Sequence, residues 1–226
     1  MGVSDIGNLY FAFGSNMDPD QMTFRRLEVE DARGAVLKDH RLAFDFPARS
    51  RWLGGAADMV EEKGARVEGV LYSLANDISI MDPWEGGYKR VPVGVLIPHA
   101  GRTVHVWTYV VVDKGPLMTP SEVYVGQMLK GAREFGLSNG YIKELEDHME
   151  AGRRELGDHV AAVRAVATSG KPLALEELAT AIDRPVDRVE EVLSDLGRWG
   201  WVTANNEPPV FRIVEGKEAR SPWVLK

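Results

Sequence analysis

A chain of 226 residues with 44% hydrophobic and 27% charged side chains has the composition of a globular protein and enough length for a sizeable core. Its net charge of −7 argues against a general nucleic-acid-coating role, and its lack of cysteine excludes disulfides, thiolate metal sites and a cysteine nucleophile. Residues 1–7 show no signal-peptide pattern and no stretch approaches the roughly 18 apolar residues of a membrane span, so we expect a soluble, cytoplasmic protein.

The first predicted elements are a strand and a helix joined by a short turn. The apolar run 9–13 ends at Gly14 and predicts a buried strand, while Asp18 followed by Pro19 predicts a helix over about 19–28. The intervening turn, Gly14-Ser15-Asn16, can expose consecutive backbone N–H groups to a carboxylate or an oxyanion. A plain strand-to-helix connection uses the same residue types, so the turn alone leaves both interpretations open.

Strand-like segments dominate the middle of the chain. They lie at 41–46, 54–60, 66–74, 88–97 and 103–112, and the last alternates Val104 and Val106 with His105 and Trp107. This period of two is typical of a sheet with two different faces. A short helix or turn is predicted at 76–84, and helices are predicted at about 121–135 and 139–150.

Glu85 is the acidic residue of greatest chemical interest. It lies beside Trp84 in a glycine-rich stretch that leads into a strand. A carboxylate that folding removes from water can act as a general base near neutral pH. The alternative is a surface acid paired with Lys89 or Arg90.

Six motifs in a fixed order are more specific than any one of them. They are Tyr-Phe-Ala-Phe-Gly-Ser-Asn at 10–16, Trp-Leu-Gly-Gly-Ala-Ala at 52–57, Val-Glu-Gly-Val-Leu-Tyr at 67–72, Met-Asp-Pro-Trp-Glu-Gly at 81–86 before Tyr-Lys-Arg at 88–90, Pro-Ser-Glu-Val-Tyr at 120–124, and Gly-Ala-Arg-Glu-Phe-Gly-Leu at 131–137. With these motifs the chain resembles the gamma-glutamylcyclotransferases and their AIG2-like relatives, including the gamma-glutamylamine cyclotransferase group. The resemblance extends to about residue 148, or two thirds of the chain.

The resemblance implies an α+β fold whose first domain, residues 1–152, is a small mixed β-barrel with flanking helices and a cavity at its mouth. It implies a cofactor-free, metal-free cyclotransferase that converts gamma-glutamyl amides or peptides to 5-oxoproline and a free amine or amino acid. Glu85 falls on the catalytic position, and the positions that fall on the substrate-binding site are Phe11, Ala12, Phe13, Gly14, Ser15, Asn16, Tyr88 and Tyr124. Phe13 is a departure, since the family often has tyrosine there.

The implied reaction agrees with what the residues lack. The α-amine of a gamma-glutamyl amide can attack its own side-chain carbonyl, so the enzyme has to fold the substrate and move protons. Ser15 has no G-x-S-x-G context that would make it a nucleophile, and the five histidines show no metal-ligand spacing.

The last seventy residues have a different pattern. Helices predicted at 158–169, 175–182 and 185–199, followed by a strand–turn–strand over 200–214, resemble a winged helix-turn-helix domain over 157–226, with a boundary near 152–157. Nine lysines and arginines against eleven acidic residues give this segment a net charge of −2, and its candidate recognition helix is acidic. DNA binding is therefore disfavoured relative to protein contact, dimerisation or covering of the active site.

The predicted partner is a small gamma-glutamyl substrate, with neither nucleic acid nor membrane involved and a homodimer left open. One alternative function is a metabolite-binding barrel coupled to a winged-helix regulatory or protein-interaction domain. Another is a biosynthetic enzyme that releases a gamma-glutamyl-masked amine, which shares the chemistry but not the substrate.

Overall fold

The computed structural model describes residues 6–205, 209–217 and 222–225, and its contacts divide them into two compact units. The first unit contains residues 6–47, 56–118 and 124–148, and the second contains the remaining described residues. The elements, in chain order, are β1 (Leu9–Ala12), η1 (Ser15–Met17), α1 (Pro19–Phe24), β2 (Val29–Pro47), α2 (Arg49–Trp52), β3 (Gly55–Leu74), η2 (Ile78–Trp84), β4 (Tyr88–Ile97), η3 (Pro98–Ala100), β5 (Arg102–Val111), α3 (Glu122–Glu134), α4 (Asn139–Thr168), β6 (Leu173–Ala174), α5 (Leu175–Ile182), α6 (Val186–Arg198), β7 (Val202–Asn205), β8 (Val210–Ile213) and α8 (Pro222–Leu225).

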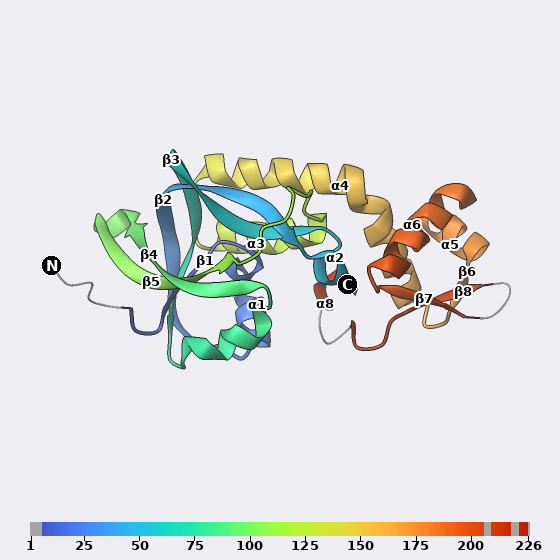
Figure 1. Ribbon diagram of the computed structural model, residues 1–226, viewed down its shortest axis with the longest axis horizontal. Helices are drawn as coiled ribbons and strands as arrows, with labels where there is room; N and C mark the ends of the chain where they lie inside the picture. Colours follow the sequence, from blue (N-terminus) through green and yellow to red (C-terminus); the bar gives the residue numbers. More distant parts are fainter. Residues whose placement is uncertain (1–5, 206–208, 218–221, 226) are drawn as a thin grey trace. The chain divides into compact units, whose positions relative to one another are not determined.

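A closed five-stranded barrel forms the first unit, with strand order β1-β3-β2-β4-β5 (Figure 1). The sheet is mixed, because β1 is antiparallel to β3 but parallel to β5 through the pair Tyr10 and Trp107. The apolar run of β1 is buried as predicted, and the hydroxyl of Thr108 on β5 donates to the backbone oxygen of Phe11 at 2.8 Å. The prediction of a mixed α+β barrel is therefore confirmed.

Strands β2 and β3 are longer than the sequence pattern predicted. The prediction of separate strands at 54–60 and 66–74 was wrong, because β3 runs unbroken through the polar segment between them, and β2 starts at Val29 instead of residue 41. Those polar residues are exposed, so they carry no apolar alternation. Gly64 lies there at φ +84°, and its amide donates to Asp39, which itself has a positive φ.

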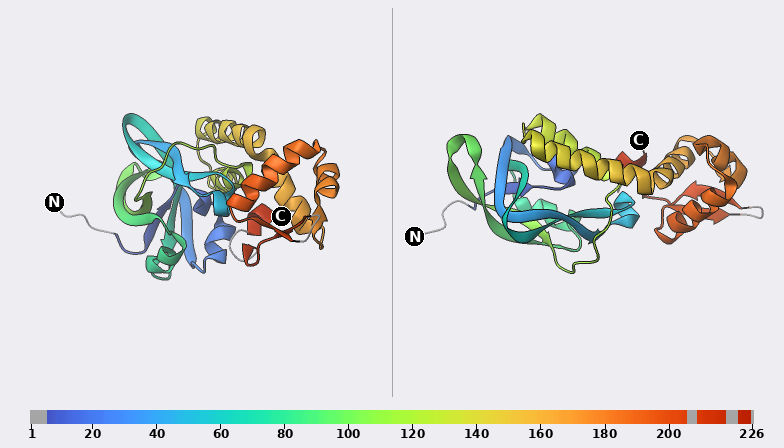
Figure 2. Two further views of the ribbon diagram at one scale, coloured as in Figure 1. Left: turned by 45° about the vertical axis from the view of Figure 1, so that its right-hand side comes forward. Right: turned by 90° about the horizontal axis from the view of Figure 1, so that it is seen from above.

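Helix α1 is fixed at both its start and its side. Asp18 is the N-cap as predicted and accepts from the amide of Asp20 at 3.0 Å, although the helix ends at Phe24 rather than residue 28. Lys130 on α3 donates to Asp18 at 2.7 Å. Figures 1 and 2 show α3 and the first half of α4 side by side along the barrel, joined by an ion pair between Arg133 and Glu146.

Helix α4 also differs from expectation. Two helices were predicted, at 139–150 and 158–169, whereas the structure has one continuous helix from Asn139 to Thr168. The boundary was predicted near 152–157, but Gly152 lies inside the helix, where a Cβ would approach the backbone oxygen of Pro120 to 2.4 Å. The glycine thus permits close packing and does not end the helix.

The second unit contains a three-stranded sheet of order β6-β8-β7 together with α5 and α6, drawn in orange to red in Figures 1 and 2. The predicted helices and the strand pair are present, and most apolar positions of α6 are buried, among them Val189, Val192 and Leu196, whereas Val186 is exposed. The turn residues Asn206, Glu207 and Pro208 lie outside the described residues. The winged-helix assignment itself stays a prediction.

Acidification is expected to weaken the second unit through His159. Its side chain is buried, stacks on Trp199 and contacts Asp195 at 3.1 Å, and burial lowers its pKa despite the opposing effect of Asp195. The unfolded chain then binds a proton more readily than the folded one, so stability falls as the pH drops below about 6.5. The free energy of unfolding, measured with urea, should fall less between pH 7.5 and pH 5.5 in His159→Gln than in wild type. Equal decreases in the two proteins would contradict this expectation.

Among the described residues, no helix combines the length and apolar character that crossing a membrane requires.

Candidate active site

Glu85 is held in a tight turn between η2 and β4. Its amide donates to the backbone oxygen of Asp82 at 3.2 Å, and its own oxygen accepts from the amide of Tyr88 at 2.9 Å. Gly87, inside this turn, has φ +90°, and a Cβ there would lie 2.4 Å from the ring of Phe46. The turn therefore requires glycine, which fixes where the Glu85 side chain leaves the backbone.

The Glu85 side chain faces inward, toward the loop that follows β1. Its Oε1 accepts from Nδ2 of Asn16 at 3.0 Å and from Nη1 of Arg25 in an ion pair. The side chain of Glu85 is 11% exposed and that of Arg25 is 3% exposed. The alternative of a surface acid paired with Lys89 or Arg90 is wrong, since Arg25 takes this place and Arg90 pairs with Asp82.

Asn16 connects the loop to the carboxylate. Its Nδ2 also donates to the hydroxyl of Tyr10 at 2.7 Å, and its Oδ1 accepts from Nε2 of Gln21 at 2.7 Å. The same Gln21 nitrogen donates to Oγ of Ser15 at 2.7 Å. One side chain of α1 thus holds two residues of the predicted Gly-Ser-Asn motif in place.

Tyr124 and Tyr88, which were predicted site residues, meet at Ala57 on β3. The hydroxyl of Tyr124 accepts from the amide of Ala57 at 2.9 Å, while the hydroxyl of Tyr88 donates to the oxygen of Ala57 at 2.9 Å. A Cβ on Gly14 would lie 2.7 Å from the Tyr124 hydroxyl. The Tyr124 hydroxyl therefore lies against the Gly14-Ser15-Asn16 turn, and the amides of this turn stay candidates for holding a ligand.

The tyrosines near Glu85 are neutral at physiological pH. Burial raises the pKa of Tyr124 to about 12. It also raises the pKa of Tyr10 and of Tyr88 far above the ordinary value, and the charge of Glu85 adds to both shifts. These phenols can donate and accept hydrogen bonds but do not serve as bases, a role that Glu85 alone among these groups can take.

Phe11, Ala12 and Phe13 are core residues in this structure. They are 0%, 1% and 5% exposed, and the rings of Phe11 and Phe13 lie 6.2 Å apart between centroids. Their apolar packing positions the following turn, and a direct role in binding substrate stays a prediction.

Sequence reasoning missed the four residues that organise the site: Tyr10, Gln21, Arg25 and Ala57. Gln21 and Arg25 lie four positions apart in a predicted helix, so they share a face. That spacing was the available signal, but it does not reveal that the face is buried.

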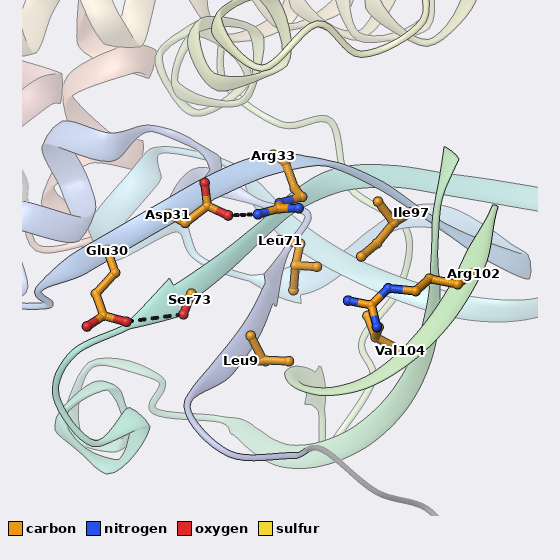
Figure 3. A pocket seen from close by; sticks show the side chains of 9 residues that line it. All are labelled: Leu9, Glu30, Asp31, Arg33, Leu71, Ser73, Ile97, Arg102 and Val104. Atoms are coloured by element: carbon orange, nitrogen blue, oxygen red, sulfur yellow. Dashed lines mark hydrogen bonds and ion pairs between the residues drawn. The ribbon is translucent and has the colours of Figure 1, made fainter. Parts of the chain in front are cut away.

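A separate cavity of about 240 Å³ lies near the start of β1 (Figure 3). Its lining contains Leu9, the first residue of β1, whereas the Gly14–Asn16 turn follows the last, so the cavity is at the opposite end of that strand. None of the predicted site residues lines it. Among the described residues, no group of three or more His, Cys, Asp or Glu side chains is placed to hold a metal ion.

Replacing Tyr124 by phenylalanine tests its role as the link between the turn at Gly14 and Ala57. The buried Ala57 amide would lose its acceptor, which costs about 1–3 kcal/mol. We expect kcat to fall by at least about tenfold, because misplaced donors weaken transition-state stabilisation. The matched control is Tyr141→Phe, a buried tyrosine of α4 beside Glu68, which should retain wild-type activity. Equal activities for the two variants would contradict the assignment.

Three comparisons with known proteins bear on this site. A model of the AIG2-like family matches residues 66–145. The gamma-glutamylcyclotransferase of Bos taurus is 30% identical over 144 residues, which is 61% of this chain and 76% of that protein. The corresponding protein of Mus musculus is 30% identical over 147 residues, with 61% and 77% covered.

A solved structure named gamma-glutamyl cyclotransferase is similar in fold. It aligns with a TM-score of 0.54 at 26% identity, over 61% of this chain and 85% of that one. Its similarity agrees with the five-stranded barrel described above.

Proposed function

The chain belongs to the gamma-glutamylcyclotransferase family, and from that premise we propose that it converts gamma-glutamyl amides or peptides to 5-oxoproline and a free amine or amino acid. The observation that supports this reaction best is the Glu85 carboxylate, which lies against Asn16 and beside a turn with backbone donors.

The reaction is an intramolecular aminolysis. Glu85 takes a proton from the α-ammonium of the substrate, and the resulting amine attacks the side-chain carbonyl carbon to form a five-membered ring. The ring nitrogen still carries two protons after the attack. The protonated Glu85 gives its proton to the leaving nitrogen, and the amide C–N bond breaks. Glu85 then takes the surplus proton from the ring nitrogen and passes it to the released amine, which leaves as an ammonium ion. Atoms and charges balance without a cofactor, and the carboxylate is regenerated at each turnover.

Folding the substrate is the other half of the catalysis. Well-oriented intramolecular reactions reach effective molarities of about 10⁵–10⁸ M, so holding the glutamyl chain in its cyclic conformation supplies much of the rate. The amides of Gly14 and Asn16 would stabilise the carboxylate or the oxyanion. The buried aromatic residues around them keep water away and favour cyclisation over hydrolysis.

Residues 157–226 are proposed to be a winged-helix-like domain that contacts protein rather than DNA. The basic side chains around α6 are engaged by acids within their own unit. Arg184 and Arg188 both pair with Asp158, and Arg198 pairs with Asp195. Cations neutralised in this way contribute little to phosphate binding.

A panel of gamma-glutamyl amino acids and gamma-glutamyl amines tests the proposal and identifies the leaving group. Release of 5-oxoproline from the amino-acid members would indicate a peptide substrate, and release from the amines alone would favour the deprotecting enzyme. If no member yields 5-oxoproline, but a bound metabolite changes the affinity for another macromolecule, the metabolite-binding barrel becomes the better account.

A further inference from the structure

We infer that Arg25 is a positioning residue, which anchors one oxygen of Glu85 so that the other faces the substrate. This inference rests on the proposed function for its catalytic consequence, but the positioning itself can be measured without substrate.

The side chain of Arg25 contacts the Glu85 segment at three points. Its Nη1 donates to Glu85 Oε1 and lies 3.3 Å from Sδ of Met81. The guanidinium also lies over the ring of Trp84, 5.9 Å from the centroid. Met81 and Trp84 belong to η2, and Trp84 directly precedes Glu85. Arg25, at the end of α1, therefore holds both the acid and the helix that leads into it.

The burial of Arg25 points to function more than to stability. Its side chain is 3% exposed, and its Nε is buried without a hydrogen-bond partner among the described residues. An unsatisfied buried donor costs about 1–3 kcal/mol, and buried ion pairs are often no more stable than apolar replacements. An arrangement that keeps such a cost is expected where orientation of the partner matters.

The two carboxylate oxygens of Glu85 differ in the hydrogen bonds that they accept. Both Asn16 and Arg25 donate to Oε1, and they come from different elements, the η1 turn and the end of α1. Oε2 accepts none of the hydrogen bonds in the part of the chain that the structure describes. One oxygen is thus the anchor, and the other is available for the proton of the substrate.

Arg25 also sets the charge around the acid. The titratable groups that face Glu85 are Arg25 from α1, Tyr10 from β1, Tyr88 from β4 and Tyr124 from α3. The three tyrosines are neutral near pH 7, so Arg25 is the cation that favours the ionised carboxylate.

Three variants test the inference: Arg25→Met, Arg25→Lys and, as control, Arg33→Met. Met keeps an apolar stem without charge, Lys keeps the charge without the planar fork, and Arg33 pairs with Asp31 at an exposed position. For Arg25→Met we expect kcat to fall about a hundredfold, the size of effect that small misplacements produce, with KM changing much less. The acid limb of kcat/KM should move to higher pH.

Arg25→Lys should leave that limb near its wild-type pH and recover part of kcat, while Arg33→Met should match wild type. A merely structural role would lower the whole pH profile without moving its limb, and that result would overturn the inference. If Arg25→Met does not fold, Arg25→Lys is compared with Arg33→Met instead. A lower kcat in Arg25→Lys supports the inference, and equal kcat values in the two variants overturn it.

Crystal structures of the Arg25 variants separate this inference from the proposed function. Positioning predicts that the Glu85 carboxylate shifts or takes several conformations while Asn16 and Tyr124 stay in place. A carboxylate that does not move overturns the inference even if 5-oxoproline is released. A displaced carboxylate supports it even if no tested substrate is converted.

Discussion

Replacing Glu85 by glutamine should lower 5-oxoproline release by about 10²–10⁴-fold, the usual contribution of a positioned general acid–base group. Glutamine has nearly the same shape, and its side-chain oxygen can still accept from Asn16 and Arg25, which contact Oε1 in the wild type. What it loses is the ability to take a proton from the α-ammonium and return it to the leaving nitrogen. We therefore expect the loss in kcat, with KM changed much less.

Stability has to be measured beside activity, because the substitution leaves the Arg25 cation, 3% exposed, without its counter-charge. A lower Tm with a normal circular dichroism spectrum would be compatible with this account. The matched control is Glu30→Gln, an acid near the opposite end of the barrel that lines the cavity of Figure 3 and should stay fully active. Activity retained in Glu85→Gln would mean that another group is the base.

Gly131→Ala should destabilise the first unit by about 1–3 kcal/mol or more, the range measured for overpacked sites. A Cβ at this position would lie 2.0 Å from the backbone oxygen of Met17, at the end of η1. Helix propensity predicts the opposite sign, a gain of about 1 kcal/mol for alanine over glycine inside a helix. The clash wins because backbone cannot rotate away as a side chain can.

Gly126→Ala in the same helix, α3, is the matched control. Nothing lies within 4 Å of a Cβ there, so propensity should dominate and the variant should be as stable as wild type or more stable. The urea midpoint of Gly131→Ala should therefore fall, whereas that of Gly126→Ala should stay the same or rise. Because η1 contains Ser15 and Asn16, Gly131→Ala should also reduce activity, whereas Gly126→Ala should not. Destabilisation of both variants to the same extent would contradict the close-packing argument.

The sequence predicted most of the elements because local signals were strong there. The β1 run and the Asp18-Pro19 start are local patterns, and the structure follows them. The central part of β3 and the middle of α4 were missed, since exposed polar residues hide a strand and a packing glycine resembles a helix end. In both places long-range contacts decide the structure, and a local pattern does not encode them.

The candidate site was predicted through the combination of motifs and not through any single one. The contact of Asn16 with Glu85 joins residues 69 positions apart, and family resemblance, not local pattern, suggested it. The role of Arg25 could not be predicted, because burial of a charged residue depends on the partner that folding brings to it.

The most direct test of the account is to identify the product from a single gamma-glutamyl substrate in water enriched in ¹⁸O. Cyclisation predicts 5-oxoproline and the free amine in equal amounts, with no ¹⁸O in the ring carbonyl, because the attacking nitrogen comes from the substrate. Glutamate carrying ¹⁸O in its side-chain carboxyl would show that water is the nucleophile. That result would contradict the proposed intramolecular aminolysis.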